Sequence, residues 1–280
     1  MRTDESPRTL RCGKHLLTLD RVLMMGVLNV TPDSFSDGGR YLDAGKAIAR
    51  GRQLIADGAD ILDIGGESTR PGSDPVSEEE ELRRVEPVIE GLLADAQAPL
   101  SIDTCKPAVA RRCLDLGVTM LNDVTALRRP EMMEVAASHD VPVILMHMLG
   151  EPKTMQDDIS YDDVAAEVKA YLGERAREAA SRGVGQIIVD PGIGFGKTTQ
   201  HNLILLQRLR EFKELPYPLL IGVSRKSFIG SMSGAEPGDR LGGTLAAMTA
   251  AILNGADIVR VHDVAECRQA ARIAEGIRSA

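Results

Sequence analysis

The sequence predicts a closed barrel of eight parallel strands, each followed by a helix, within a single domain. Eight short apolar runs alternate with longer stretches of helical periodicity. The 280 residues match the length of one such barrel. Glycine-containing joints of similar sequence lead from several helices into strands. An open, doubly wound sheet shows the same alternation and is the alternative fold.

The expected strands are short and rich in aliphatic residues. They cover residues 22–30, 61–66, 100–104, 120–124, 142–147, 187–191, 218–224 and 258–262. Amphipathic stretches between them predict helices such as 43–57, 77–96, 106–116, 161–181 and 243–254. Eight strand–helix units in a chain of this length favour closure into an α/β barrel.

Two joints repeat one pattern, DGADILDIGG at 57–66 and NGADIVRVHD at 254–263. Gly58 and Gly255 are placed to end a helix in the left-handed conformation before the next strand begins. No linker rich in Pro, Gly or Ser divides the chain. We therefore expect residues 21–280 to form the barrel and residues 1–20 to form an N-terminal arm.

Composition limits the class of protein. The formal net charge of −8 and the 3% aromatic content argue against a nucleic-acid surface or an anionic membrane as partner. No apolar run approaches the roughly 18 residues that would span a bilayer, and the N-terminus resembles no export signal. The four cysteines form no CxxC pair, so neither a zinc site nor a disulfide framework is predicted. We expect a cytoplasmic protein with reduced thiols.

Polar side chains gather at the carboxyl ends of the expected strands, where barrels of this class carry their active sites. They are Asn29, Asp63, Glu67, Asp103, Asn122, His147, Asp190, Ser224, Arg225, Lys226, Arg260 and His262. Each inward polar group costs about 1 to 3 kcal/mol if it lacks a partner. Such a ring needs a mutual network or a ligand, although bonding of Asp63 to a neighbouring strand would be a purely structural role.

The residue types favour two subsites. Asp103, Asn122 and Asp190, with Lys226 nearby, can bind the amide and amino groups of a flat heterocycle, which favours a pterin or purine-like ligand. Donors around a second point suit an anion such as diphosphate; they are Thr69, Arg70, Arg260 and His262. Asn29 offers a neutral oxygen ligand for Mg²⁺, completed by water and phosphate oxygens.

The segment PGIGFGKT at 191–198 resembles a nucleotide-binding loop but fits neither common pattern. Pro191 stands where a phosphate-binding loop needs its first glycine, and Lys197 stands where a dinucleotide-binding turn needs its third. The sequence also has no HExxH motif, which weakens the prediction of a zinc hydrolase.

Seven segments in order resemble the dihydropteroate synthase family over most of the chain from residue 21 onward. They are MGVLNVTPDSFSDGG, DIGGESTRPG, SIDT, LNDV, VDPGIGFGK, SRKSFIG and RVHDV. The resemblance implies a TIM-like barrel, usually a homodimer. It also implies a transferase that joins 4-aminobenzoate to a dihydropterin-methyl diphosphate with release of diphosphate, and that is the target of sulfonamides.

The resemblance also implies roles for individual residues. Asp103, Asn122, Asp190 and Lys226 would hold the pterin, with Met146 lining its pocket and Arg260 covering a ring face. Asn29 would bind Mg²⁺, and Thr69, Arg70, Arg260 and His262 would contact the diphosphate. Phe35, Pro71, Phe195, Lys226 and Ser227 would shape the aminobenzoate site. Reactivity would depend on Asn29, Arg70, Asp103, Lys226, Arg260 and His262.

The loops after the first two expected strands would close over the substrates, and the diphosphate would leave before the amine attacks. Two alternatives stay open. One is a pterin-binding barrel that only presents a folate, as in corrinoid-dependent methyltransferases, although the SRKSF segment and Phe35 argue for an aminobenzoate pocket. The other is an inactive paralogue, although Asn29, Arg70, Arg260 and His262 are all present.

Overall fold

The protein is a single-domain (β/α)8 barrel, as the sequence predicts. The computed structural model describes residues 8–31, 40–68, 73–95, 97–150 and 153–280. Its barrel strands are all parallel and follow the order β8-β7-β6-β5-β4-β3-β10-β9. They are β3 (Leu23–Asn29), β4 (Ile61–Gly65), β5 (Leu100–Asp103), β6 (Met120–Asp123), β7 (Pro142–Met146), β8 (Gln186–Asp190), β9 (Leu220–Ile221) and β10 (Ile258–Val261).

The barrel closes between β8 and β9. Val189 forms a parallel bridge with Leu219, and its N–H donates to the carbonyl of Pro218 at 2.9 Å. The first and last strands of the ladder therefore meet, and the open doubly wound sheet considered from the sequence is wrong for this chain. The strand β9 is shorter than the predicted 218–224, and the carboxyl side of that range runs as irregular backbone.

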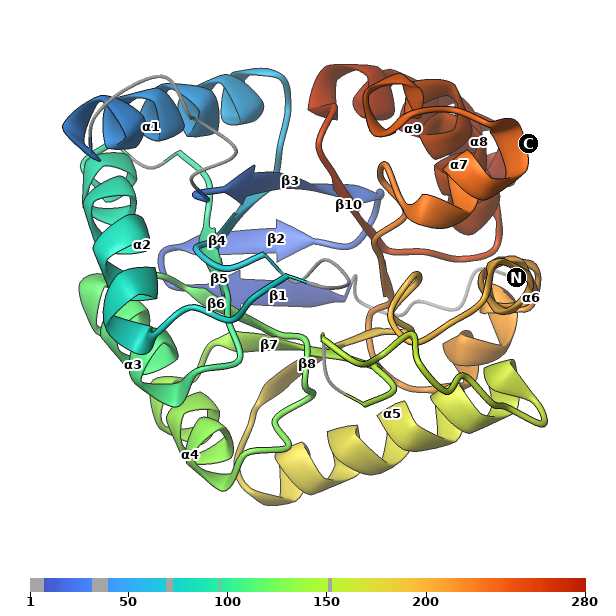
Figure 1. Cartoon of the computed structure of the whole chain (residues 1–280), viewed down its shortest axis with the longest axis horizontal. Helices are drawn as coiled ribbons and strands as arrows, with labels where there is room; N and C mark the ends of the chain where they lie inside the picture. Colours follow the sequence, from blue (N-terminus) through green and yellow to red (C-terminus); the bar gives the residue numbers. More distant parts are fainter. Residues whose placement is uncertain (1–7, 32–39, 69–72, 96, 151–152) are drawn as a thin grey trace.

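Helices surround the barrel (Figure 1). They are α1 (Arg40–Ala56), α2 (Glu78–Leu93), α3 (Pro107–Leu116), α4 (Pro130–His139), α5 (Val164–Ser181), α6 (Thr199–Gln207), α7 (Ser227–Ser233), α8 (Leu241–Leu253) and α9 (Val264–Ser279), with 3-10 turns at Leu209–Glu214 and Pro237–Asp239. Gly58 and Gly255 have φ angles of 105° and 102°, which confirms the left-handed conformation expected at those joints.

Residues within the predicted N-terminal arm form a hairpin of β1 (Thr9–Cys12) and β2 (His15–Thr18), which crosses the barrel in Figure 1. Leu10 and Cys12 pack on the apolar side chains at the amino ends of the barrel strands. The Gln186 side chain fixes the hairpin because it accepts from the Arg11 N–H at 2.7 Å and donates to the Arg11 carbonyl at 3.0 Å. The hairpin therefore covers the end of the barrel opposite to the polar strand ends.

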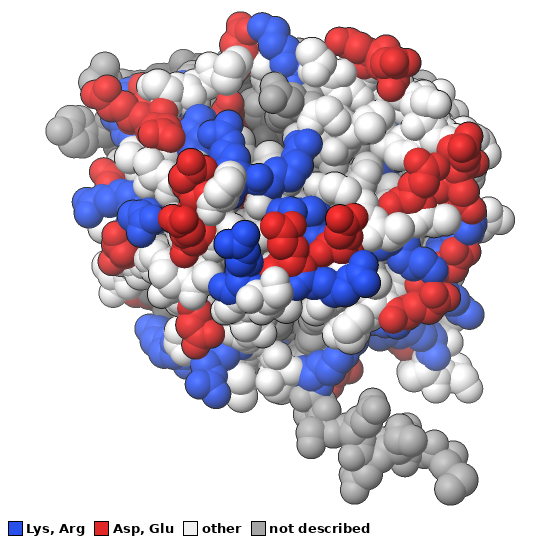
Figure 2. All heavy atoms as spheres, turned by 90° about the horizontal axis from the view of Figure 1, so that it is seen from below, with Lys and Arg blue, Asp and Glu red and all other residues white. Residues whose placement is uncertain are grey.

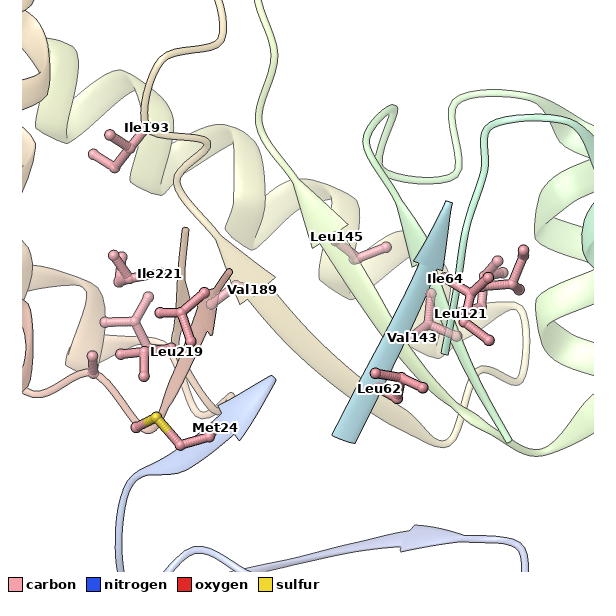
Figure 3. Close-up of a cluster of buried hydrophobic side chains, with 14 of the residues drawn as sticks. Met24, Leu62, Ile64, Leu121, Val143, Leu145, Val189, Ile193, Leu219 and Ile221 are labelled. Carbon is pink, nitrogen blue, oxygen red and sulfur yellow. The ribbon is translucent and has the colours of Figure 1, made fainter. Parts of the chain in front are cut away.

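The side chains of each strand alternate between two environments. Outward side chains belong to the main core, which also contains buried helix residues; Figure 3 shows Leu62, Leu121, Val143 and Val189 of this cluster. Inward side chains near the amino ends form a separate apolar layer against the hairpin: Leu23, Met25, Ile61, Met120, Ile144, Ile188, Leu220 and Ile258. The described residues therefore fill the barrel interior at this end, and the polar strand ends lie at the other end.

On the face in Figure 2, Lys and Arg side chains lie interspersed with Asp and Glu. Lys169 and Glu214 form one of the ion pairs at the protein surface, with 2.8 Å between Nζ and Oε2. Among the described helices, none is long and apolar enough to cross a bilayer.

Candidate active site

On several strands, one inward side chain is apolar and the next inward side chain, two residues further along, is polar. Because side chains alternate, the residue two positions after an inward apolar residue also points inward, one layer closer to the carboxyl ends. Ile61, Met120, Ile188 and Ile258 of the apolar layer are followed in this way by Asp63, Asn122, Asp190 and Arg260. Asp103 lies beside Asn122 in the strand register, so it joins the same polar layer.

One hydrogen-bonded network joins four of these side chains. Arg260 donates from Nε to Asp63 Oδ2 and from Nη2 to Asp103 Oδ2, each at 2.6 Å. Asn122 donates from Nδ2 to the same Asp63 oxygen at 3.0 Å. Asp63 is wholly buried. Asp63 therefore bonds to two side chains of the site, whereas the sequence also allowed a purely structural bond to a neighbouring strand.

Asp63 and Asp103 share one guanidinium, and the pKa of Asp103 is raised to about 7, so the network carries excess negative charge when Asp103 is ionised. Burial lowers the pKa of Arg260, but Asp63 and Asp103 outweigh this and raise it above its ordinary value, so the guanidinium stays charged. Burial raises the pKa of Asp103; Arg260 opposes the rise and Asp63 adds to it. Asp63 Oδ1 and Asp103 Oδ1 are buried without a hydrogen-bond partner among the described residues. The network therefore has unused acceptors for N–H groups.

Asp190 provides another buried carboxylate at the end of β8. Its Oδ1 accepts the Gly192 N–H at 2.7 Å. Burial raises its pKa to about 6, opposed by that hydrogen bond and by the charges of Lys226, Arg260 and Lys197. The Nζ of Lys226 lies 4.0 Å from the centroid of the Phe195 ring. The structure therefore brings Asp190, Lys226 and Phe195 together at one side of the site.

An apolar cluster lines this side of the polar layer. It contains Val124, Met146, Met148, Met155 and Phe195, with Cys105 packed against it. Met146 is the register partner of Asp190. Burial raises the pKa of the Cys105 thiol to about 11, so this thiol stays protonated and serves as packing. A flat ring could lie against this wall while the carboxylates bind its edge.

Asn29 ends β3 and pairs in the strand register with Gly65. A Cβ built on Gly65 would lie 3.6 Å from Asp103 Cβ and 3.9 Å from Asn29 Oδ1. The missing side chain leaves space between the amide oxygen and the carboxylate network. No group of three or more Cys, His, Asp or Glu suited to a metal ion occurs among the described residues. A metal at Asn29 would take most ligands from water or substrate, the coordination that Mg²⁺ prefers.

His262 follows β10 and is hydrogen-bonded to Ser224. The backbone N–H of His262 donates to Ser224 Oγ at 3.2 Å, and Nδ1 of His262 lies 3.0 Å from the same Oγ. Burial and, to a smaller extent, the positive charge of Arg260 together lower the pKa of His262 to about 3. With the hydroxyl donating to Nδ1, the neutral imidazole carries its proton on Nε2. His262 can then donate one hydrogen bond without bearing charge.

The remaining predicted site residues divide into two groups. Ser227 begins α7 beside Lys226 and is exposed. Phe35, Thr69, Arg70 and Pro71 lie outside the described residues, as does the loop at 33–39 that we expect to close over the substrates.

Lys197 and His147 form a buried pair that sequence reasoning did not identify. Lys197 Nζ lies 2.9 Å from Nδ1 of His147. Burial lowers the pKa of Lys197 to about 7 and that of His147 to about 2. His147 is among the polar strand ends that the sequence indicates, whereas Lys197 in the PGIGFGKT segment served only as an argument against nucleotide-binding loops.

The family described as "Pterin binding enzyme" matches residues 25–262. The dihydropteroate synthase of Escherichia coli strain K12 is 47% identical over 266 residues, 94% of each chain. The Xanthomonas albilineans enzyme, solved with 4-aminobenzoic acid, is 47% identical with a TM-score of 0.93 over 98% of this chain and 100% of that one.

Other solved structures extend the comparison. The Xanthomonas albilineans enzyme with 7,8-dihydropteroate is 45% identical, with a TM-score of 0.89 over 98% of this chain and 100% of that one. The Yersinia pestis dihydropteroate synthase with a sulfonamide drug complex is 42% identical, with a TM-score of 0.92 and the same coverage. The matched segment includes the polar strand ends from Asn29 to His262. The chain therefore belongs to the dihydropteroate synthase family of pterin-binding enzymes.

Proposed function

We propose that this protein joins 4-aminobenzoate to 6-hydroxymethyl-7,8-dihydropterin diphosphate, giving 7,8-dihydropteroate and diphosphate. The observation that carries the proposal is the buried Asp103 Oδ1, which has no partner among the described residues and lies beside Asn122 at the carboxyl end of the barrel. A carboxylate with a free oxygen there accepts the N–H groups of a guanidine-like ring edge. The relatives solved with 4-aminobenzoate and with 7,8-dihydropteroate support the same pair of substrates.

The pterin lies in the space between the network and the apolar cluster. Asp103, Asn122, Asp190 and Lys226 bind its edge, and Met146 lines one face. Arg260 uses two N–H groups on Asp63 and Asp103, which leaves three for the ligand. The planar face of the guanidinium can cover the other ring face, and the remaining N–H groups can reach the diphosphate.

The diphosphate binds beside Asn29 and His262. Thr69, Arg70, Arg260 and His262 donate to its oxygens, and Asn29 would hold Mg²⁺ in the space left open by Gly65. A bound Mg²⁺ would neutralise charge on the leaving group. The neutral His262 donates a hydrogen bond and adds no charge that would depend on pH. Arg70 and Arg260 supply the positive charge from the protein.

4-Aminobenzoate binds next to the pterin, against Phe195 and near Lys226 and Ser227, with Phe35 and Pro71 completing the site. Sulfonamides compete for this position, as the drug complex of the Yersinia pestis relative supports. The Lys226 ammonium lies over the Phe195 ring. It therefore places positive charge close to where a benzoate or sulfonyl group would lie.

The C–O bond breaks before the new bond forms. When Asp103 is ionised, it and Asp63 together outweigh the charge of Arg260 and favour the cation that develops on the pterin methylene group, and the Asp190 carboxylate adds to this. The aromatic amine then attacks as a neutral nucleophile and needs no strong base. The amine proton leaves with solvent or diphosphate.

Incubation of the purified protein with both substrates and Mg²⁺ tests the activity, with formation of 7,8-dihydropteroate followed by chromatography. We expect turnover that stops when 4-aminobenzoate is omitted and falls when a sulfonamide is added. Pterin binding in calorimetry without any product would contradict the proposal and favour a barrel that only presents a folate.

Isotope exchange tests the order of bond changes. With ¹⁸O in the bridging C–O–P position and no 4-aminobenzoate, early C–O cleavage would move the label into non-bridging positions of the recovered substrate. An unscrambled label in an enzyme competent for turnover would favour direct displacement.

The proposal extends to a homodimer in the cytoplasm. Ile273 and Ile277 are 65% and 59% exposed and lie one turn apart on α9, and Met232 on α7 is 63% exposed. Exposed apolar side chains of this kind suit a second copy of the chain. Sedimentation velocity would give the mass of a dimer, and Ile273→Glu combined with Ile277→Glu should give a monomer. A monomeric wild-type protein would contradict this part.

A further inference from the structure

Lys197 is 3% exposed, and the acceptors that the structure gives its ammonium group are neutral. Nζ donates to Nδ1 of His147 at 2.9 Å, to the carbonyl of Phe195 at 3.0 Å and, at a longer 3.4 Å, to the carbonyl of His147. The ammonium has three N–H groups, and these contacts use all of them. The acceptors belong to two loops, one after β7 and one after β8.

These two loops are pressed together at the backbone. Gly192 and Gly196 have φ angles of 67° and 62°. A Cβ on Gly192 would lie 1.9 Å from the carbonyl oxygen of His147, and a Cβ on Gly196 would lie 2.4 Å from Leu149 Cβ. The turn at 191–197 can therefore take this position only with glycine at these points. The buried Lys197 side chain connects the same two loops by its hydrogen bonds to His147 and Phe195.

Donors from the turn itself and from the segment between β7 and α5 hold the carbonyl groups of this turn. Phe195 N–H donates to Gly192 O at 3.1 Å, Gln156 Nε2 to Gly194 O at 3.1 Å, and Tyr161 Oη to Gly196 O at 3.0 Å. Lys197 supplies the donor for the carbonyl of Phe195 itself. The Lys197 hydrogen bond therefore holds the backbone of Phe195. The ring of Phe195 lies under Lys226 and against the methionine cluster.

We propose that Lys197 is a positioning residue for the aminobenzoate subsite, fixing the turn that carries Phe195 against the loop after β7. This inference rests on the proposed function, because it assigns Phe195 to the second substrate. Lys197 acts through Phe195 and does not touch a substrate. An apolar side chain of the same length would fill the space but would leave the Phe195 carbonyl and His147 Nδ1 without their donor.

The test compares Lys197→Met with Lys169→Met, the same substitution at a lysine on the outer face of α5 that pairs with Glu214. In Lys197→Met we expect the KM for 4-aminobenzoate to rise roughly 10- to 100-fold, as expected for a misplaced contact. The Kd for the pterin diphosphate, measured by calorimetry without 4-aminobenzoate, should stay within about threefold. Lys169→Met should change neither value.

Two results would overturn the inference. One is an unchanged KM for 4-aminobenzoate in a folded Lys197→Met protein, even if its melting temperature falls. The other is an equal loss of affinity for both substrates, which would indicate general disruption of the site. Absence of turnover in the wild-type protein would instead contradict the proposed function, so the two failures are distinguishable.

A double-mutant cycle covers the case in which Lys197→Met does not fold. Lys197→Gln keeps a polar N–H₂ group in the buried space, but its side chain is one bond shorter and has two N–H groups for the three acceptors; it is combined with Phe195→Leu. If Lys197 acts through Phe195, Lys197→Gln should raise the KM for 4-aminobenzoate in the wild-type background and have little further effect beside Phe195→Leu. Independent, additive effects, or no effect of Lys197→Gln alone, would contradict the positioning role.

Discussion

Asp63 and Arg260 are joined across the inside of the barrel by a hydrogen bond of 2.6 Å between Oδ2 and Nε. They lie on β4 and β10, which are separated in the sheet by β3. The bond fixes the plane of the guanidinium, and the second bond to Asp103 fixes its rotation. Arg260 is thereby oriented before any substrate arrives, which reduces the reorganisation that binding would require.

Replacement of Asp63 by Asn tests this relationship. The amide keeps an acceptor for Arg260 but removes the charge, so the guanidinium has only Asp103 as an anionic partner. We expect kcat/KM for the pterin diphosphate to fall by roughly 10- to 100-fold, because the guanidinium is less well oriented. Steady-state kinetics with saturating 4-aminobenzoate would measure the effect.

Asp60→Asn is the matched control. Asp60 lies just before β4, at the opposite end of the barrel, and binds Arg21 and Arg268. Its substitution also weakens ion pairs, here partly exposed ones, and should lower stability, but it should leave the kcat/KM of the folded protein within about twofold, because this end of the barrel serves stability. Equal kinetic losses in both variants would show that Asp63 acts only through stability.

The ligand-free protein should be more stable when Asp190 is replaced by Asn. Burial raises the pKa of Asp190 to about 6 from 3.8, so its ionised form is disfavoured by folding. Because the folded-state pKa of Asp190 lies above its unfolded value, its contribution to the free energy of unfolding is most favourable below the unfolded pKa. This contribution is lost as the pH rises through the folded-state pKa. Asp190 therefore destabilises the free protein most above about pH 6.

We expect Asp190→Asn to raise the free energy of unfolding at pH 8 by on the order of 1 to 3 kcal/mol and by less at pH 5. Asn keeps an acceptor for the Gly192 N–H. Urea titrations at both pH values would measure the difference, with the exposed Asp158→Asn as control. Pterin affinity should fall in the same variant. A loss of stability at pH 8 would show that the charge is compensated in the free protein.

The polar layer could be predicted from the sequence because it depends on the order of apolar and polar residues within each strand. Each strand reads as an apolar run that ends in a polar residue, and in a closed barrel such ends face one site. The identity of partners could not be predicted this way. Arg260 is 197 residues from Asp63, and their contact depends on the register of three strands. The short runs on either side of Gly13 form a hairpin in which Cys12 pairs with His15. A glycine between two such runs is typical of a hairpin turn, but the prediction of an N-terminal arm did not use it.

Lys197 shows a second limit. Its burial depends on acceptors from a neighbouring loop and on a turn whose carbonyl groups are held by Gln156 and Tyr161. None of these contacts follows from spacing along the chain. A lysine in a glycine-rich segment is more often solvated than buried, so composition pointed away from its position here.

Asn29→Ala should weaken the response to Mg²⁺ without weakening the pterin site. Removal of the amide oxygen takes away the ligand that we propose for the ion, so half-maximal activity should need roughly tenfold more Mg²⁺. Calorimetry with a pterin that lacks diphosphate should give an unchanged Kd. If the Mg²⁺ dependence were also unchanged, Asn29 would have no part in metal binding.

Neutral His262 should be replaceable by a neutral donor. Burial lowers its pKa from 6.5 to about 3, so it is uncharged throughout the range from pH 5 to 9 in the folded protein. A folded-state pKa below the unfolded value means that protonation favours the unfolded chain as pH falls below 6.5, so His262 contributes to acid unfolding.

The proposed role of His262 is a single hydrogen bond from Nε2 to the diphosphate. His262→Gln keeps an N–H donor, whereas His262→Ala has none, so kcat should be roughly tenfold higher in the Gln variant than in the Ala variant. The ¹H NMR signal of the His262 ring should not shift between pH 5 and 8. A shift with a midpoint near 6.5 would show that the imidazole becomes charged in the site and that charge, rather than one hydrogen bond, is its contribution.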